Sequence, residues 1–231
     1  MTVLRDPILE SLLATLHARS DEQLKAMMAA YADRARTDQP RASAAEEAGR
    51  LKAYLSDKMV ALDRDKAAFC YQLCRALNAR RIVEIGTSYG VSTLYLAAAV
   101  RDNMRAAGGP GLVIGTEYEP GKADAARATF RQAGLSSFIE LREDDLRQTL
   151  KHLEGLIDFA LVDIWIDMAR PAIELVAPHL RPGAIVICDN TERYRKEYAD
   201  YLAFIDNPAN GFRTTTLPFD GGLTLSVRCP A

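Results

Sequence analysis

The sequence of 231 residues lacks several features that mark other classes of protein. Its longest apolar runs, such as residues 94–100, are far shorter than the ~20 residues that a membrane-spanning helix needs. Lysine and arginine (29) nearly balance aspartate and glutamate (31), and no basic stripe is visible, which argues against nucleic acid as the main partner. The N-terminus has no apolar core before a small-residue cleavage site, so we expect mature protein rather than a signal peptide.

Cysteine, histidine and tryptophan are scarce, with four, three and one residues. Cys70 and Cys74 lie one helical turn apart, but no second pair matches them as a zinc site would require. We therefore interpret all four cysteines as small buried residues of a protein in the reducing cytoplasm. The histidines fall in helical contexts away from the expected strand ends, where surface or packing roles are expected; they are His17, His152 and His179.

The first third of the chain has apolar residues at helical spacing and no strand signal. Residues 12–35 and 67–77 both follow this pattern, and a break with proline and serine lies between them at 37–43. We divide the chain into an N-terminal helical extension, residues 1–60, and a main domain, residues 61–231.

The main domain alternates short apolar runs with amphipathic segments. This alternation is typical of an α/β protein whose parallel sheet is covered by helices on both faces. The five expected strands are 81–86, 111–117, 137–141, 157–163 and 183–189, and the expected helices are 90–104, 121–134, 144–153, 169–180 and 192–205.

The C-terminal part departs from this alternation. Two further apolar segments, 211–219 and 223–228, are separated by the turn Asp220-Gly221-Gly222. An Asp-Gly-Gly sequence strongly favours a hairpin, so the sheet is expected to end in two antiparallel strands.

Chemically active side chains follow the expected strand ends, where parallel sheets bind their ligands. After the first strand, a turn carries Gly86 and Gly90 and leads into a helix whose free N–H groups can hold a ligand. The spacing of these glycines does not match the three-glycine dinucleotide fingerprint, which argues against a nicotinamide-dependent oxidoreductase. Glu117 ends the second strand and could bind two ribose hydroxyls, or could instead favour the start of the next helix.

Three oxygen-bearing side chains end the fourth and fifth strands. They are Asp163, Asp189 and Asn190, and together they could hold a Mg²⁺ ion that keeps several waters. The alternative is that each residue only caps the following helix or turn.

Four motifs in this order resemble the class I S-adenosylmethionine-dependent methyltransferases. They are RIVEIGTSYGVSTLYLA, GTEYEP, LVDIW and VICDN. More narrowly, the chain resembles the catechol and caffeoyl-CoA O-methyltransferases and their small bacterial relatives over about residues 60 to 230. The resemblance implies a Rossmann-like fold, S-adenosylmethionine as cofactor and Mg²⁺ or another divalent cation as a second one.

The resemblance also implies roles for individual residues in binding the cofactor. Glu84 and Gly86 would lie along its methionine end, and Ser92 would contact its carboxylate. The full implied set is Glu84, Gly86, Thr87, Ser88, Gly90, Ser92, Glu117, Tyr118, Asp145, Leu146 and Asp163.

At the adenosine end, the resemblance assigns the ribose hydroxyls to Glu117 and an adenine contact to Tyr118. Asp145 and Leu146 would border the adenine, the first through its side chain and the second through its backbone. From the residues alone, Asp145 could equally be an N-terminal helix cap.

The acceptor side departs from the family pattern. Asp163, Asp189 and Asn190 match the family's metal ligands, and Trp165 matches a wall of the acceptor site. The family commonly has a lysine three residues after the first metal-binding aspartate, but here that position is Ile166, which cannot transfer a proton.

The resemblance therefore predicts transfer of a methyl group to a hydroxyl of a small catechol-like molecule, assisted by a metal. Three alternatives remain: an N- or C-methyltransferase without a metal, a slow cofactor-binding protein, and a non-catalytic partner subunit. The N-terminal helices are expected to cover the acceptor pocket or to form a homodimer contact.

Overall fold

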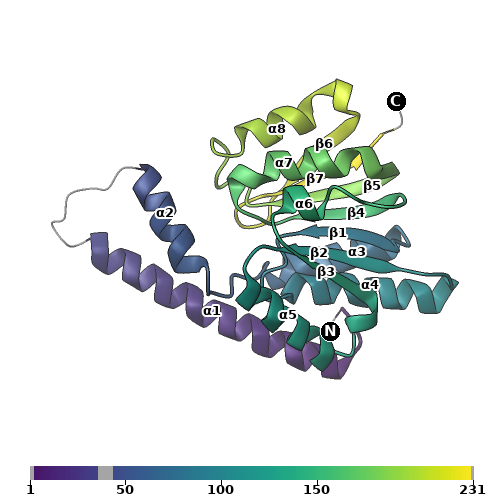
Figure 1. The fold of residues 1–231 in the computed structure, drawn as a ribbon, viewed down its shortest axis with the longest axis horizontal. Coiled ribbons are helices and arrows are strands. Elements are labelled where there is room, and N and C mark those ends of the chain that lie inside the picture. The colour runs from purple at the N-terminus through teal and green to yellow at the C-terminus, as the bar shows by residue number, and fades with distance from the viewer. Residues whose placement is uncertain (1–2, 36–43, 230–231) are drawn as a thin grey trace.

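The structure is a computed structural model that describes residues 3–35 and 44–229. Its centre is a seven-stranded sheet in the order β3-β2-β1-β4-β5-β7-β6, with helices on both faces (Figure 1). The strands are β1 (Arg81–Ile85), β2 (Leu112–Glu117), β3 (Ile139–Glu143), β4 (Ile157–Val162), β5 (Leu180–Asp189), β6 (Phe212–Leu217) and β7 (Leu223–Arg228).

The sheet has the predicted mixed direction. Strands β1 to β5 pair in parallel, whereas β7 lies antiparallel between β5 and β6. The turn before β7 carries Gly221 and Gly222 with φ of +75° and +79°, a conformation that glycine adopts without a steric penalty. The predicted α/β fold with a terminal hairpin is therefore confirmed.

Helices cover the sheet in two groups. On one face lie α3, α4 and α5, and on the other lie α6, α7 and α8, while α1 and α2 form the N-terminal part (Figure 1). Their bounds are α1 (Pro7–Ala35), α2 (Ala44–Leu55), α3 (Arg64–Ala76), α4 (Val91–Ala107), α5 (Pro120–Gln132), α6 (Leu146–Thr149), α7 (Ile166–Val176) and α8 (Ala199–Asp206).

Each face of the sheet has its own hydrophobic core. Successive side chains of a strand point to opposite faces, so Ile82 packs with α4 while Val83 packs with α7. On β4, Phe159 likewise packs in the first core and Ala160 in the second. Burial on both faces explains why the central strands are continuous apolar runs in the sequence.

The N-terminal helix packs along only part of its length. Leu9, Leu13 and Leu16 are buried at four- and three-residue spacing, and this end of α1 contacts α4. Further along α1, Leu24 and Met28 are 47% and 62% exposed. This second half of α1, together with α2, extends beyond the sheet (Figure 1). The predicted break at 37–43 lies outside the described residues.

Three local expectations are wrong. The helix predicted at 192–205 begins only at Ala199, and the backbone N–H groups of Glu192 and Arg193 donate to the carbonyl oxygen of Gly221 (3.0 and 2.9 Å). The segment before α8 is thereby tied to the β6–β7 turn.

The helix predicted at 144–153 is reduced to α6. The Arg142 guanidinium donates to the carbonyl oxygens of Thr149 (2.7 Å) and His152 (3.0 Å), so these groups bond a side chain instead of a further helical turn. Residues 56–63, expected to be helical, form an irregular connection between α2 and α3. Within residues 3–35 and 44–229, no helix is long and apolar enough to cross a membrane.

Candidate active site

The carboxyl ends of β1, β2, β4 and β5 form the edge of the sheet where the predicted site residues gather. The turn after β1 is held between its neighbours, because Thr87 N donates to Thr116 O (2.9 Å) and Asp163 N donates to Ile85 O (3.0 Å). Glu84, Glu117, Asp163 and Asp189 therefore come from four strands that lie side by side in the sheet.

The two glycines after β1 allow close packing at this edge. Gly86 has φ of +96°, and a Cβ atom at this position would lie 2.0 Å from the carbonyl oxygen of Asp163. A Cβ atom at Gly90 would lie 2.3 Å from the Phe130 ring on α5. Gly86 thus brings the turn against the end of β4, and Gly90 brings α4 against α5.

Glu84 places a buried carboxyl group below this turn. Its Oε2 accepts hydrogen bonds from the hydroxyls of Thr87 (3.0 Å) and Thr93. Its Oε1 is buried and has no hydrogen-bond partner among the described residues. Burial raises the pKa of Glu84 to about 7, although the neighbouring hydroxyl groups lower it in part.

The unpartnered oxygen of Glu84 fits the cofactor that the sequence implies. A buried acceptor without a donor costs about 1 to 3 kcal/mol, so a cationic ammonium placed beside it would be stabilised. The methionine end of S-adenosylmethionine carries such an ammonium. Ser88 on the same turn also has a buried hydroxyl oxygen without a partner in the described part of the chain.

Glu117 lies next to the same turn at the end of β2. Its Oε2 accepts from Ser88 N (2.7 Å), and its Oε1 accepts from Tyr118 N (3.0 Å) and Glu119 N (2.8 Å). A carboxylate offers about four acceptor positions, so the three N–H groups fix this side chain and leave capacity for a ligand hydroxyl.

The residues predicted to border the adenine differ in their exposure to solvent and in their partners. Tyr118 is 67% exposed and Leu146 is buried. Asp145 caps α6, since its Oδ1 accepts from Arg147 N (2.8 Å), and its ion pair with the Arg147 guanidinium (2.5 Å) helps to lower the pKa of Asp145 to about 2. Asp145 is therefore an N-terminal helix cap in this structure. The adenine contacts of Tyr118, Asp145 and Leu146 stay predictions.

Asp163 follows β4 and faces other acidic groups. Burial raises the pKa of Asp163 to about 8, and repulsion from the Asp189 and Glu84 carboxylates adds to this effect. Three carboxyl groups in one low-dielectric region favour cations, which must come from the protein or from a ligand.

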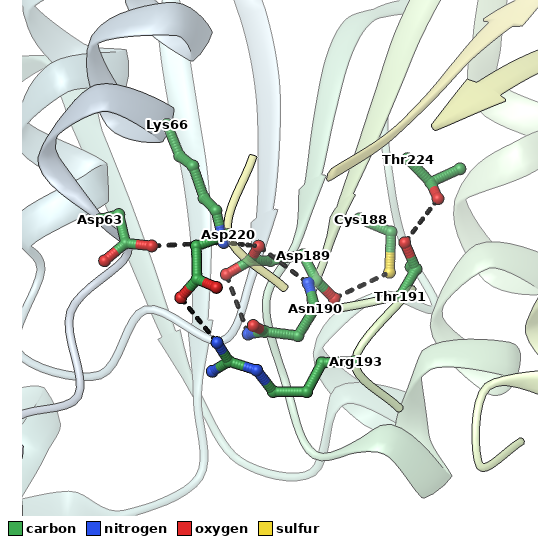
Figure 2. Close-up of polar contacts among 9 residues, drawn as sticks. All are labelled: Asp63, Lys66, Cys188, Asp189, Asn190, Thr191, Arg193, Asp220 and Thr224. Carbon is green, nitrogen blue, oxygen red and sulfur yellow. Dashed lines mark hydrogen bonds and ion pairs between the residues drawn. The ribbon is translucent and has the colours of Figure 1, made fainter. Parts of the chain in front are cut away.

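A lysine on α3 forms an ion pair with one of these carboxylates. Lys66 on α3 is 1% exposed, and its Nζ donates to Asp189 Oδ1 at 2.6 Å. Nζ also lies 3.3 Å from Asp63, just before the helix. Figure 2 shows Lys66 directed at Asp189, with the Asn190 amide on the other side of the carboxylate.

Asp189 accepts three hydrogen bonds from these donors. Its Oδ1 accepts from Lys66 Nζ and from Asn190 N (2.8 Å), and its Oδ2 accepts from Asn190 Nδ2 (3.0 Å). The carbonyl oxygen of the Asn190 side chain instead lies against Gly221, where an added Cβ atom would be 2.5 Å away.

The predicted metal ligands, so arranged, do not fit a divalent cation. Such an ion needs deprotonated oxygens that face it, whereas Asp189 faces an ammonium group and Asn190 presents its NH₂ group. Across residues 3–35 and 44–229, no three side chains of histidine, cysteine, aspartate or glutamate converge as metal ligands.

The predicted acceptor side lies at the start of α7. Trp165 immediately precedes the helix, and Lys52 from α2 places its Nζ 5.7 Å from the centre of the indole ring. Ile166 is the first residue of α7 and packs against the hydrophobic core on that face. The first carbons of a lysine side chain at position 166 would therefore be partly buried.

The connection between α2 and α3 covers the glycine turn. Tyr89 in that turn donates through its hydroxyl to Asp57 O (2.8 Å), and Lys122 on α5 donates to Leu55 O (2.9 Å). Ser20 on α1 holds the same connection by donating to Met59 O (3.1 Å).

Beside this connection is a cavity of about 480 Å³. It lies between α1, the start of α3 and the β6–β7 turn. Its lining includes Lys66, Asp63, Phe219 and Asp220, with His17 and Ser20 from α1.

Lys66 is the site residue that the sequence analysis missed. A signal for it was available, because Lys66, Cys70 and Cys74 are spaced by four residues and so share one face of α3. That face is buried. A lysine on a buried face needs a charged partner, which here is Asp189.

Comparison with known proteins gives the family of the central part of the chain. Residues 83–191 match a family model described as a methyltransferase domain. This match covers a little under half of the chain. The domain runs from β1 through β5 and so contains the glycine turn and all four acidic strand ends.

Two curated relatives of this methyltransferase domain are named catechol O-methyltransferase. The protein from Mycobacterium tuberculosis is 32% identical over 135 residues, which cover 58% of this chain and 58% of the relative. The protein from Niastella koreensis is 31% identical over 126 residues, covering 53% and 52%. The chain thus spans a little over half the length of these curated relatives. The resemblance drawn from the sequence motifs is confirmed.

Solved structures extend the likeness to most of the fold. A structure titled as a putative O-methyltransferase from Klebsiella pneumoniae has a TM-score of 0.68 at 21% identity, covering 87% of this chain and 95% of that one. An O-methyltransferase from Bacillus cereus, solved in complex with SAH, has a TM-score of 0.65 at 21% identity, covering 95% and 99%. At this identity, the likeness establishes the fold alone.

Glu84 is expected to make stability depend on pH. Its pKa rises from 4.5 to about 7 on folding, so the folded state binds the extra proton between these values. The stabilisation is complete below about pH 4.5 and is lost as the pH rises through about 7. Relative to Glu84→Gln, the free energy of unfolding of the wild type should fall by about 3 kcal/mol across this range, as measured by urea titration.

Exposed Glu154 provides the control for this measurement. Glu154→Gln should follow the wild-type profile at every pH. A constant difference between wild type and Glu84→Gln from about pH 4.5 to about pH 8 would contradict the raised pKa.

Proposed function

We propose that this protein transfers a methyl group from S-adenosylmethionine to a hydroxyl group of a small, catechol-like aromatic molecule. The observation that carries the proposal is the pair of carboxyl groups, Glu84 and Glu117, at neighbouring strand ends of the methyltransferase domain. One has an oxygen without a partner, and the other is fixed by three N–H groups. The names of the curated relatives support the choice of acceptor.

The cofactor, when bound, supplies a methyl group on a positively charged sulfonium sulfur. The chain's task is then to hold the two reactants in line and to favour the ionised acceptor oxygen. Glu84 would hold the cofactor's ammonium, and Glu117 would accept hydrogen bonds from its ribose hydroxyls. The new bond joins the methyl carbon to the acceptor oxygen as the bond to sulfur breaks, and the hydroxyl proton leaves to solvent or to a nearby base.

The acceptor would enter from the side of Trp165, which immediately precedes α7. Trp165 offers an aromatic wall, and its contact with Lys52 gives α2 a role in covering the acceptor. The metal-assisted form predicted from the sequence would require Asp189 to exchange the Lys66 ammonium for a cation. No step of the proposed reaction depends on that exchange.

Binding of the cofactor tests the role of Glu117. In Glu117→Gln, one amide oxygen replaces two carboxylate oxygens, so the ribose contacts and the Ser88 N–H cannot both be kept. The dissociation constant for S-adenosylmethionine, measured by calorimetry, should rise about tenfold or more. Glu119→Gln, two residues further on, should bind like the wild type.

The transfer itself is tested by mass spectrometry with catechol, a catecholamine and a methyl-labelled cofactor. The label should appear on a ring oxygen. Label on the amine nitrogen, or cofactor binding without any transfer across the acceptors, would overturn the proposal.

Ile166→Lys tests whether the absence of a lysine at this position lowers the rate of turnover. If proton removal limits turnover, a lysine at the start of α7 should raise the rate at neutral pH about tenfold or more, with the larger effect on acceptors of higher pKa. Ile166→Met is the matched control, because methionine has similar bulk and cannot take a proton. Equal rates in the wild type and Ile166→Lys, with both folded, would show that proton removal does not limit turnover.

We also propose a homodimer in the cytoplasm, formed through the second half of α1. Leu24 and Met28 are exposed apolar side chains on the part of α1 that extends beyond the sheet. Light scattering should give a dimer mass for the wild type and a monomer mass for the double variant Leu24→Glu, Met28→Glu. A monomer mass for the wild type would contradict the proposal.

A further inference from the structure

We infer that the ammonium group of Lys66 takes the place of a divalent cation at the carboxyl ends of β4 and β5. Lys66 Nζ lies 2.6 Å from Asp189 Oδ1, and both residues are almost completely buried. A charge from α3 thus balances, within the chain, a carboxylate that would otherwise attract a metal ion. The exclusion of a metal ion by Lys66 does not depend on the proposed reaction. The role of Lys66 in holding the acceptor does rest on the proposed function.

The position of Lys66 in its helix supports this assignment. Lys66 is the third residue of α3, where the helix dipole disfavours a positive charge. A buried lysine also loses its hydration. Strong partners must offset both of these unfavourable free energies. They are Asp189, at 2.6 Å, and Asp63, at 3.3 Å.

The geometry leaves a metal ion no easy entry. Both oxygens of Asp189 accept hydrogen bonds from Lys66 and Asn190 (Figure 2). The carbonyl oxygen of the Asn190 side chain lies against Gly221. The helix that carries Lys66 is held in place by the buried side chains of Cys70 and Cys74 on the same face of α3.

Lys66 is also one of the residues that line the cavity beside α1 and the β6–β7 turn. An ammonium has three N–H donors, of which two are directed at Asp189 and Asp63. Lys66 lines the 480 Å³ cavity, so a third donor can reach an acceptor oxygen there. A charge-assisted hydrogen bond favours the ionised oxygen, which is the effect that a bound metal ion would have.

Titration of the full chain with Mn²⁺, followed by electron paramagnetic resonance, tests the inference directly. The wild type should show no site tighter than about 1 mM, whereas Lys66→Met should gain one such site per chain, because Asp163, Asp189 and Asn190 then lose their internal cation. Lys66→Arg keeps the positive charge and should not gain the site. Lys25→Met removes an exposed lysine of α1 and should behave like the wild type.

Three results would overturn the inference. The first is a stoichiometric Mn²⁺ site in the wild type that Asp189→Asn abolishes. The second is a folded Lys66→Met protein that gains no site, and the third is a Lys66→Arg protein that gains one. If Lys66→Met does not fold by circular dichroism, the wild type and Lys66→Arg decide: no site in either supports the inference, and a site in either overturns it.

The titration contains neither cofactor nor acceptor, so its outcome does not depend on the proposed reaction. Absence of methyl transfer would leave the metal result standing, and Mn²⁺ binding by the wild type would leave cofactor binding through Glu117 intact. Where transfer is observed, excess chelator should leave its rate within about twofold, while Lys66→Met should lower it more strongly than Lys25→Met.

Discussion

The crowding of acidic groups at one edge of the sheet is the constraint on which the rest of this site depends. Glu84, Asp163 and Asp189 come from neighbouring strands and lie where water is largely excluded, so their charges repel one another. Among the described residues, only Asp189 of these three has a cation of the chain within hydrogen-bond distance. Burial raises the pKa of Glu84 and of Asp163, which favours their protonated forms unless a cationic ligand lies beside them.

Segments on the N-terminal side of β1 also contribute to the site. The cation for Asp189 comes from α3 of the main domain, and the connection before α3 is held by Tyr89, Lys122 and Ser20. The helical extension contributes the start of this connection, which covers the glycine turn, and α1, which lines one side of the cavity.

Much of the fold was predictable because burial on both faces requires continuous apolar strands, and the hairpin because Asp-Gly-Gly suits few other structures. The acidic site residues followed from strand order, which brings their ends together. Lys66 did not, since its partner lies 123 residues away in the sequence. The contact between residues 192–193 and Gly221 was not predictable for a similar reason, since about thirty residues separate the partners. Local periodicity contains no information about such distant partners.

The bonds to Gly221 have a consequence for how the protein is made. The segment after β5, including Glu192 and Arg193, takes its shape from a turn about thirty residues later in the chain. As the ribosome releases the chain, β1 to β5 can pair while the loop that carries Asn190 still lacks its anchor. The glycine turn after β1 can thus form early, whereas the loop that carries Asn190 is completed only when β7 lies between β5 and β6.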